Sequence, residues 1–398
     1  MKASWQTKTL KDTCVFLNGL WKGKIPPFVQ VGVIRNTNFT KEGTLDDSDI
    51  AYLPVERKQF EKRRLQSGDI ILEKSGGGPK QPVGRVILYD KREGDFSFSN
   101  FTSAIRVRNP TELDYRFLHR YLWWVHSSGV TEKMQSHSTG IRNLDGDAYK
   151  SIRITFPPLP EQHRIVAILD EAFAGIATAT ANAERNLNNA REVFKAKLKS
   201  TFSDDTNGWE LKSLSEVSSF EGGSQPPKTE FIHQNKPSYV RFLQIRDFAS
   251  DKNVTYIPES KKNRLCSADD ILIGRYGASV GKILTGKAGA YNVAMMKAIP
   301  DLVQLKRSWF FYYLISDEFQ ARLANTSSRS AQDGFSKDDI ANFPVPLPTI
   351  SEQNRIIAKI EALSAETQRL QDIYQQKVSV LNELKQSILH QAFSGQLH

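Results

Sequence analysis

Cysteine is scarce in this chain of 398 residues, which has two, Cys14 and Cys266. Two cysteines so far apart in the sequence make neither a disulfide framework nor a zinc cluster. Long apolar runs are also missing, since none approaches the ~20 residues that a membrane span needs. The first residues, MKASWQTKTLKD, lack the apolar stretch of a signal peptide. We therefore expect a protein of the reducing cytoplasm without a transmembrane helix.

Catalytic signatures are missing as well. The seven histidines are scattered, without an HExxH pattern. The segment 276–283 resembles a phosphate-binding loop, but Tyr276 replaces its first glycine and Ile283 replaces the Ser/Thr that would bind magnesium. The glycine-rich segment 75–79 lacks dinucleotide spacing and is typical of a flexible loop. Neither a nuclease core nor an amino-methyltransferase motif is present, so catalysis is expected to belong to a partner.

Positive charge is unevenly distributed along the chain. The net charge is +10, with +8 in residues 1–157, zero in 158–204, +2 in 205–350 and zero in 351–398. A basic surplus is typical of proteins that bind the phosphate backbone of nucleic acid. A soluble protein with a basic, solvated surface remains the alternative on this feature alone.

The sequence contains two copies of one module. Residues 144–204 align without a gap with residues 335–395, and Glu-Gln-His-Arg-Ile at 161–165 falls on Glu-Gln-Asn-Arg-Ile at 352–356. Upstream the match is patchier but keeps its order: residues 34–36 fall on 245–247, 69–72 on 270–273 and 83–85 on 280–282. A period of this length with two copies indicates duplication of a whole module, not a solenoid repeat.

Each module begins with a region of short apolar runs between Gly, Pro, Asn and Ser clusters, which predicts strands. The expected strands are 28–34, 69–72, 85–89, 104–107, 239–245, 270–273 and 294–299. Helical patterns cover residues 114–126 and 306–323. We therefore predict two α+β domains, at 1–157 and 205–350.

A proline-rich step follows each domain, at 156–160 and 343–348, and no proline occurs from there to the end of the module. Proline is tolerated in the first turn of a helix but not in its interior, which predicts long helices within 158–204 and 351–398. Their apolar residues follow heptad spacing. The predicted seam consists of Val166, Leu169, Phe173, Ile176, Thr180, Ala183, Leu187, Ala190 and Phe194 in the first helix, and Ile360, Leu363, Thr367, Leu370, Tyr374, Leu381, Leu384 and Ile388 in the second. We expect the helices to pair as an antiparallel coiled coil; two separate amphipathic helices, or a seam that dimerises with another chain, are the alternatives.

These features together resemble the specificity subunit of type I restriction–modification systems. The resemblance covers essentially the whole chain and is most specific at Pro-Leu-Pro-Glu-Gln-His-Arg-Ile (158–165), at its second copy, and at Leu-His-Gln-Ala-Phe-Ser-Gly-Gln-Leu (389–397). The second copy departs by inserting Thr-Ile-Ser at 349–351, and the first ends in Phe-Ser-Asp without the glycine.

The resemblance implies a protein without catalysis of its own. Each domain would be a target-recognition domain that reads one half of a bipartite, asymmetric DNA sequence, and the paired helices would fix the spacer between the halves. Two modification subunits, which methylate adenine with S-adenosylmethionine, would bind the helices. Two restriction subunits, motor-nucleases that use ATP and magnesium, are optional further partners. No cofactor is expected in this chain, and lengthening the first helix is expected to lengthen the spacer.

Three loops in each domain are predicted to face DNA, because each combines glycine with Lys, Arg, Ser, Thr or Gln. They are residues 18–24, 74–85 and 138–143 in the first domain, and 222–228, 275–282 and 329–332 in the second. The candidate DNA-binding residues are Lys22, Lys24, Lys74, Lys80, Gln81, Arg85, Thr139, Arg142, Ser224, Gln225, Lys228, Arg275, Tyr276, Ser279, Lys282, Arg329 and Gln332.

Two other functions remain open from the sequence. One is a coiled-coil scaffold whose two domains bind proteins, with the basic charge incidental. The other, a self-contained nuclease or methyltransferase, is opposed by the missing motifs. A steep dependence of DNA binding on salt would favour the specificity subunit over a scaffold.

Overall fold

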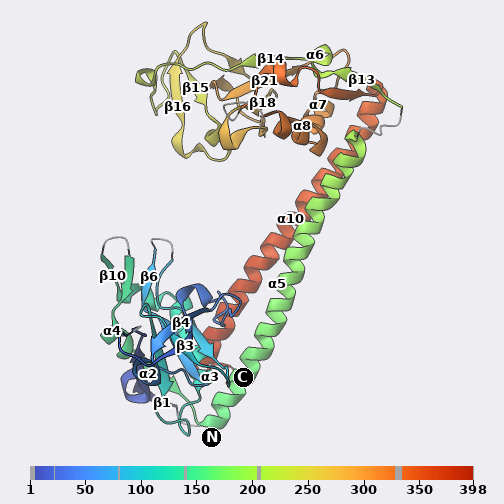
Figure 1. Ribbon diagram of the computed structural model, residues 1–398. Helices are drawn as coiled ribbons and strands as arrows, with labels where there is room; N and C mark the ends of the chain where they lie inside the picture. Colours follow the sequence, from blue (N-terminus) through green and yellow to red (C-terminus); the bar gives the residue numbers. More distant parts are fainter. Residues whose placement is uncertain are drawn as a thin grey trace. The chain divides into compact units, whose positions relative to one another are not determined.

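The computed structural model describes residues 5–21, 23–78, 81–138, 141–203, 208–327 and 334–397 (Figure 1). It has two compact units: unit 1 contains Met1–Ala183 and Gln376–His398, and unit 2 contains Glu184–Gln375. Each unit has one α+β domain and a part of each of two long helices, α5 (Leu159–Phe202) and α10 (Ile350–Phe393). The predicted fold class, two tandem α+β domains each followed by a long helix, is confirmed.

The first domain, in unit 1, is built on a four-stranded antiparallel sheet of order β2-β9-β5-β7. Its strands are β2 (Cys14–Asn18), β9 (Thr102–Val107), β5 (Asp69–Glu73) and β7 (Val86–Tyr89). A smaller sheet of order β4-β3-β8 contains β4 (Ala51–Glu56), β3 (Phe28–Ile34) and β8 (Phe96–Phe98). The ribbon of β1 (Gln6–Thr9) and β12 (Arg153–Phe156) joins the two ends of the domain.

Helix α3 (Tyr115–Ser127) covers one face of the central sheet. Ile70 and Leu72 of β5 lie in one core cluster with Phe117 of α3. Ile71 points to the opposite side, because side chains alternate along a strand, and joins Phe98 of the smaller sheet in a second cluster. The domain is therefore a helix, a central sheet and a small sheet in three layers. The remaining helical segments are α1 (Leu10–Thr13), α2 (Arg57–Glu61), α4 (Gly146–Lys150), η1 (Asn36–Asn38) and η2 (Val130–Met134).

The second domain, in unit 2, repeats the central sheet, the ribbon and the smaller sheet, and adds one edge strand to the smaller sheet. Its central sheet has the order β14-β21-β18-β19, its smaller sheet β16-β15-β20-β17, and its ribbon joins β13 to β22. The strands are β13 (Glu210–Ser213), β14 (Ser218–Gly222), β15 (Tyr239–Leu243), β16 (Thr255–Pro258), β17 (Leu265–Cys266), β18 (Ile271–Gly274), β19 (Ile283–Leu284), β20 (Gly289–Tyr291), β21 (Met295–Pro300) and β22 (Pro344–Leu347). Its helical segments are α6 (Leu214–Val217), α7 (Arg307–Leu314), α8 (Asp317–Ser327), α9 (Lys337–Ile340), η3 (Lys228–Glu230), η4 (Ile245–Phe248), η5 (Asp251–Asn253) and η6 (Gly277–Ser279).

A larger difference between the two domains is a further sheet in the first. In the first, β6 (Ser75–Gly77), β11 (Ile141–Leu144) and β10 (Gln135–Ser138) form a three-stranded sheet of order β10-β11-β6. At the corresponding place, the described part of the second domain has an isolated bridge between Tyr276 and Gly334. The repeated scaffold thus carries a larger β extension in its first copy.

A buried glutamine fastens the first turn of each long helix to its own domain. Gln162 of α5 is 0% exposed; its Oε1 accepts from the Asp114 backbone N–H at 2.8 Å, and its Nε2 donates to the carbonyls of Glu112 and Pro157 at 2.8 and 2.7 Å. Gln353 of α10 makes the equivalent bonds, from Lys306 N–H and to the carbonyls of Gln304 and Pro348. The pair of glutamines in the repeated Glu-Gln motif therefore has a structural role.

The last turn of each long helix is anchored in the domain of the other module. Phe202, at the end of α5, lies with its ring centroid 4.8 Å from that of Trp309 on α7. Phe393, at the end of α10, lies 5.4 Å from Phe117 and 5.3 Å from Tyr121 on α3. Each domain consequently holds the start of one long helix and the end of the other.

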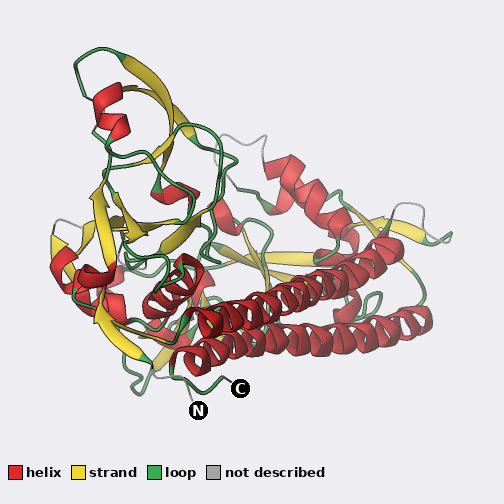
Figure 2. Cartoon of the chain, turned by 90° about the horizontal axis from the view of Figure 1, so that it is seen from below, coloured by secondary structure: helices red, strands yellow, loops and turns green. Residues whose placement is uncertain are grey.

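The two helices run antiparallel, as predicted, and Figure 2 shows them side by side. In unit 1, Nη2 of Arg164 donates to the Leu397 carbonyl at 3.1 Å; in unit 2, Nε of Arg191 donates to Oε1 of Gln371 at 3.1 Å. One predicted seam residue is wrong: Leu384 is 45% exposed. Its neighbour Lys385 takes the inner position, with Nζ 4.5 Å from the ring centroid of Trp123.

Helix α5 differs from one expectation. By length and composition alone it contains an 18-residue window apolar enough to cross a membrane, although the sequence predicts no such span. The window escapes a search for continuous apolar runs because polar residues interrupt it. A core helix of a soluble protein passes the same test, so this is weak evidence for a membrane.

We expect Gln162→Ala to lower the free energy of unfolding of the first domain by about 2–4 kcal/mol, because it leaves one backbone N–H and two carbonyls buried without partners. Gln353→Ala should affect the second domain in the same way. Urea unfolding of the full chain, followed by circular dichroism, measures both. The exposed Gln375→Ala on α10 is the control, with a change within ~0.5 kcal/mol. Equal stabilities of Gln162→Ala and this control would contradict the assignment.

Candidate nucleic-acid interface

The strand directions bring the first two predicted loops of each domain to one sheet edge. In the first domain β2 and β5 both pair antiparallel with β9, so they run in the same direction. Their carboxyl ends, Asn18 and Glu73, lie at the same edge, from which the loops 18–24 and 74–85 leave the sheet. In the second domain β14 and β18 flank β21 in the same manner and end at Gly222 and Gly274.

The third predicted loop of the first domain joins this edge through β11. Oγ of Ser75 donates to Oδ1 of Asn143 at 2.6 Å, and the Leu144 N–H donates to the Lys74 carbonyl at 2.8 Å. Asn18 and Lys74, from the first two loops, line a cavity of about 130 Å³ together with Leu144, which directly follows the third loop. The three loops of the first domain therefore meet.

The second domain brings its loops together by equivalent contacts. The Phe335 N–H donates to the Arg275 carbonyl at 3.3 Å, and Tyr276 forms a bridge with Gly334, which follows the loop 329–332. A Cβ built on Gly222 would lie 3.5 Å from Nη1 of Arg275. The Arg275 side chain therefore reaches across the sheet edge to the end of β14.

The described candidate residues differ in exposure. Six are exposed: Lys24, Gln81, Gln225, Lys228, Tyr276 and Lys282. Six are half-buried: Lys74, Arg85, Arg142, Ser224, Arg275 and Ser279. Lys22, Lys80, Thr139, Arg329 and Gln332 lie outside the described residues.

Arg85 has a structural role, although the sequence suggests a DNA contact. Its Nε and Nη2 donate to the two carboxylate oxygens of buried Glu73 at 2.7 and 2.9 Å. Further bonds reach the carbonyls of Phe39 and Asn36, at 3.4 and 3.3 Å. Four of the five guanidinium N–H groups are thus used inside the domain, which leaves little donor capacity for DNA.

Lys74 and Arg275 occupy equivalent positions. Each directly follows the loop-facing end of the central strand, and their backbone N–H groups donate to the carbonyls of Phe101 and Ala294 at 3.0 and 2.9 Å. Burial lowers the pKa of Lys74. The cation is therefore partly desolvated at the edge of the first domain, and an arginine replaces it in the second.

Sequence reasoning missed two exposed aromatic residues near the first edge. Trp21, in the loop 18–24, is 66% exposed, and Phe101, whose carbonyl also accepts from the Ser75 N–H, is 47% exposed. The signal for Trp21 is its position between Leu20 and two lysines in a loop assigned to DNA. No sequence pattern singles out Phe101, because only the fold brings the turn after β8 to this edge.

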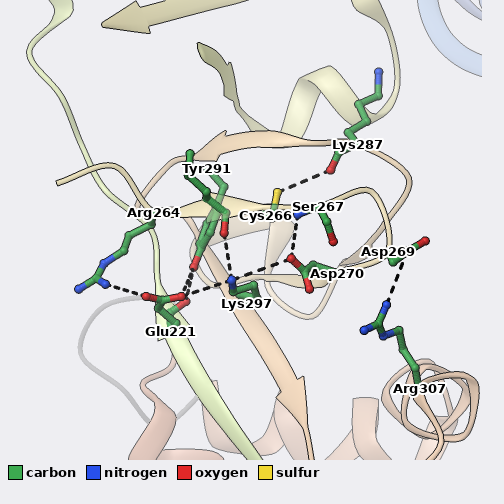
Figure 3. Close-up of polar contacts among 11 residues, drawn as sticks. Glu221, Arg264, Cys266, Ser267, Asp269, Asp270, Lys287, Tyr291, Lys297 and Arg307 are labelled. Atoms are coloured by element: carbon green, nitrogen blue, oxygen red, sulfur yellow. Dashed lines mark hydrogen bonds and ion pairs between the residues drawn. The ribbon is translucent and has the colours of Figure 1, made fainter. Parts of the chain in front are cut away.

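A polar network supports the edge of the second domain (Figure 3). Nη1 of Arg264 donates to Glu221 at 2.7 Å, and Nζ of Lys297 lies 3.5 Å from the same carboxylate. Lys297 also donates to the Leu265 carbonyl at 3.0 Å, and the Tyr291 hydroxyl donates to the Glu221 carbonyl at 3.1 Å. The two cations neutralise an acidic group one residue before the loop 222–228, where a free carboxylate would repel phosphates.

Among the described residues, candidate metal ligands do not cluster and both thiols are buried. In the part of the chain that the structure describes, no group of three or more His, Cys, Asp or Glu side chains could hold a metal ion. Burial raises the pKa of the Cys266 thiol to about 11 and that of the Cys14 thiol to about 11, so both are protonated near neutral pH. A protonated, buried thiol is a poor nucleophile.

The family model of the type I restriction–modification DNA specificity domain matches the chain twice, at residues 2–187 and 206–376. The chain belongs to the specificity subunits of type I restriction–modification systems. It is thus a non-catalytic subunit of an enzyme complex.

Known specificity subunits resemble this one over most of their length. The EcoKI specificity subunit of Escherichia coli is 25% identical over 404 residues, which cover 92% of this chain and 82% of the relative. The StySPI specificity subunit of Salmonella potsdam is 23% identical, with the same coverage of both chains.

Solved structures share the fold of this specificity subunit. A chain from a study of complex assembly and conformational transition of the type I R-M system superposes with a TM-score of 0.81 at 20% identity, and each chain is covered fully. The HsdS subunit from Thermoanaerobacter tengcongensis gives a TM-score of 0.59 at 20% identity, over 99% of this chain and 97% of the other.

Gly223 tests the packing that shapes the second edge. A Cβ at this position would lie 2.0 Å from the Asn292 carbonyl oxygen, as one at Gly19 would from that of Ser99. We expect Gly223→Ala to destabilise the second domain by about 1–3 kcal/mol, because the backbone must move. Urea unfolding measures the loss. The control is Gly175→Ala in α5, where nothing lies within 4 Å and stability should rise slightly; a similar gain for Gly223→Ala would contradict the close approach.

Proposed function

We propose that this specificity subunit reads a bipartite, asymmetric sequence of double-stranded DNA, one half with each domain. The observation that carries the proposal is that two equivalent sheet edges present different side chains. Lys74 in the first domain corresponds to Arg275 in the second, and Phe101 corresponds to Ala294. One scaffold with two different reading surfaces suits a target whose halves differ in sequence.

The proposal extends to partners. Two modification subunits would bind the helices and bring adenine methylation to the target; two restriction subunits are optional additions. S-adenosylmethionine, ATP and magnesium would then be bound by these partners. The cytoplasm is the proposed location. The two-fold repetition of the helix starts and ends supports two identical partners, because equivalent surfaces bind equivalent subunits.

We also propose that α5 and α10 determine the spacer between the half-sites. Each is 44 residues long, which corresponds to roughly 66 Å at 1.5 Å per residue. Each helix is attached to both domains. The contacts are those of Gln162 and Phe393 in unit 1 and of Phe202 and Gln353 in unit 2. The lengths of the two helices must therefore change together. Lengthening the first helix alone, the change that the sequence suggested, would leave one anchor unmatched.

A coiled-coil scaffold with two protein-binding domains is the competing function, and DNA binding decides between them. In complex with modification subunits, we expect the affinity for a duplex carrying the target to fall steeply with salt, because phosphate contacts release counterions. The specificity subunit alone should transfer no methyl group. Methylome sequencing with and without the gene names the target, and fluorescence anisotropy measures the affinity. A salt-independent affinity, or the same affinity for duplexes with either half scrambled, would favour the scaffold.

Seven residues inserted after Ala183 in α5 and seven after Val378 in α10 should lengthen the preferred spacer. One heptad preserves the seam and adds about 10 Å, close to three base-pair steps. Methylation of a duplex series with graded spacers measures the shift. The matched control is the insertion in α5 alone, which should impair assembly because Phe202 or Gln162 loses its contacts. An unchanged spacer preference in the double insertion, with both half-sites still methylated, would contradict the role of the helices.

A further inference from the structure

Arg275 is held in one orientation at the edge of the second domain. Its Nε donates to the Phe335 carbonyl at 3.3 Å. Its guanidinium carbon lies over the Tyr276 ring, 5.1 Å from the ring centroid, so the ring attracts the cation and restricts its position. On the other side of the loop, Nη1 approaches Gly222, where a side chain would lie within 3.5 Å. One hydrogen bond and one ring contact therefore orient this side chain beside the end of β14.

The outer end of this guanidinium is left with unused donors. Within the described residues, Nε makes the hydrogen bond, and no carboxylate pairs with Nη1 or Nη2. The neighbouring arginines differ: Arg264 pairs with Glu221 at 2.7 Å, and Arg241 pairs with Asp251. The Arg275 side chain is half-buried and oriented, and no carboxylate among the described residues pairs with it. Its free N–H groups are therefore available to an acceptor outside the protein.

We propose that Arg275 reads a guanine in the major groove of the half-site that the second domain binds, with Nη1 and Nη2 donating to O6 and N7. This inference rests on the proposed DNA-reading function. Guanine is the base that presents two acceptors at one major-groove edge, and a guanidinium fork matches them in a bidentate manner. Because Nε is already bonded, the end-on fork is the part of the group that remains available.

A phosphate contact explains this arrangement less well. A phosphate accepts hydrogen bonds from many directions, so an exposed lysine such as Lys282 or Lys228 can contact it without a supporting neighbour. Base reading requires a fixed plane, and the support from Phe335 and Tyr276 fixes it before binding. Tyr276 is 43% exposed and acts here as a positioning residue.

The first domain lacks this reader. Lys74 occupies the equivalent position, and a lysine ammonium is a point charge without a planar fork. Ser75 replaces the supporting Tyr276 and bonds Asn143 instead. The proposed guanine contact therefore belongs to one half-site, which makes the other half an internal control.

The test uses the complete complex with modification subunits and the target named by methylome sequencing. Each guanine of the second domain's half-site is replaced in turn by 7-deazaguanine, which lacks the N7 acceptor, and by inosine, which keeps O6 and N7. We expect one 7-deazaguanine position to weaken wild-type binding roughly ten-fold, and inosine at the same position to have little effect. Arg275→Ala and Arg275→Lys should bind unmodified DNA more weakly and lose the difference between guanine and 7-deazaguanine.

Lys282→Ala is the matched control, because this lysine follows in the same loop and is exposed. It should weaken binding to all duplexes alike and keep the 7-deazaguanine effect. Arg275→Lys keeps the charge and guards against a folding defect in Arg275→Ala.

Two results would overturn the inference while leaving the proposed function intact: a second half-site without guanine, or a 7-deazaguanine effect of unchanged size in both Arg275 variants. Binding that ignores the sequence of both half-sites in the wild type would instead overturn the proposed function.

Discussion

Gln162 and Gln353 each connect the proline-rich step and the first turn of a long helix to a residue about 50 positions away in sequence, the one from which α3 or α7 begins. A buried amide without partners is costly, so the side chain holds these parts in one arrangement. The helix that covers the central sheet and the long helix therefore leave the same point at a fixed angle. Within each unit, this contact therefore also fixes the orientation of the long helix relative to the sheet edge that carries the predicted loops, at the other end of the β-strands.

The two modules share the contacts that anchor the long helices and differ at their sheet edges. Helix starts, helix ends and sheet order are repeated, and Phe202 with Trp309 corresponds to Phe393 with Phe117. The edges diverge in side chains and in size, because the first domain adds the β10-β11-β6 sheet and the second does not show it among its described residues. Loops at a sheet edge tolerate such change because the core beneath them is closed by other residues.

The sequence predicted the parts that depend on regular spacing. The proline steps and the proline-free heptads located both long helices, since proline is excluded from helix interiors. Contacts that depend on tertiary structure were not predictable. The Arg35 N–H donates to Asn38 as the Gln244 N–H does to Asp247, so these turns correspond, whereas the alignment had placed Arg35 on Arg246. The role of Arg85 was not predictable for the same reason. Its bidentate partner, Glu73, becomes recognisable only when the hairpin is folded.

The shared anchors have a genetic consequence. Because the aligned segments 144–204 and 335–395 end each module with the same helix contacts, recombination within them exchanges a whole domain at a point where both parents fit. The hybrid chain keeps the glutamine and phenylalanine contacts of its long helices. Its hydrophobic cores therefore stay intact, while the pair of sheet edges that it carries is new. A single crossover at this point therefore replaces one sheet edge and leaves the anchoring of the long helices unchanged.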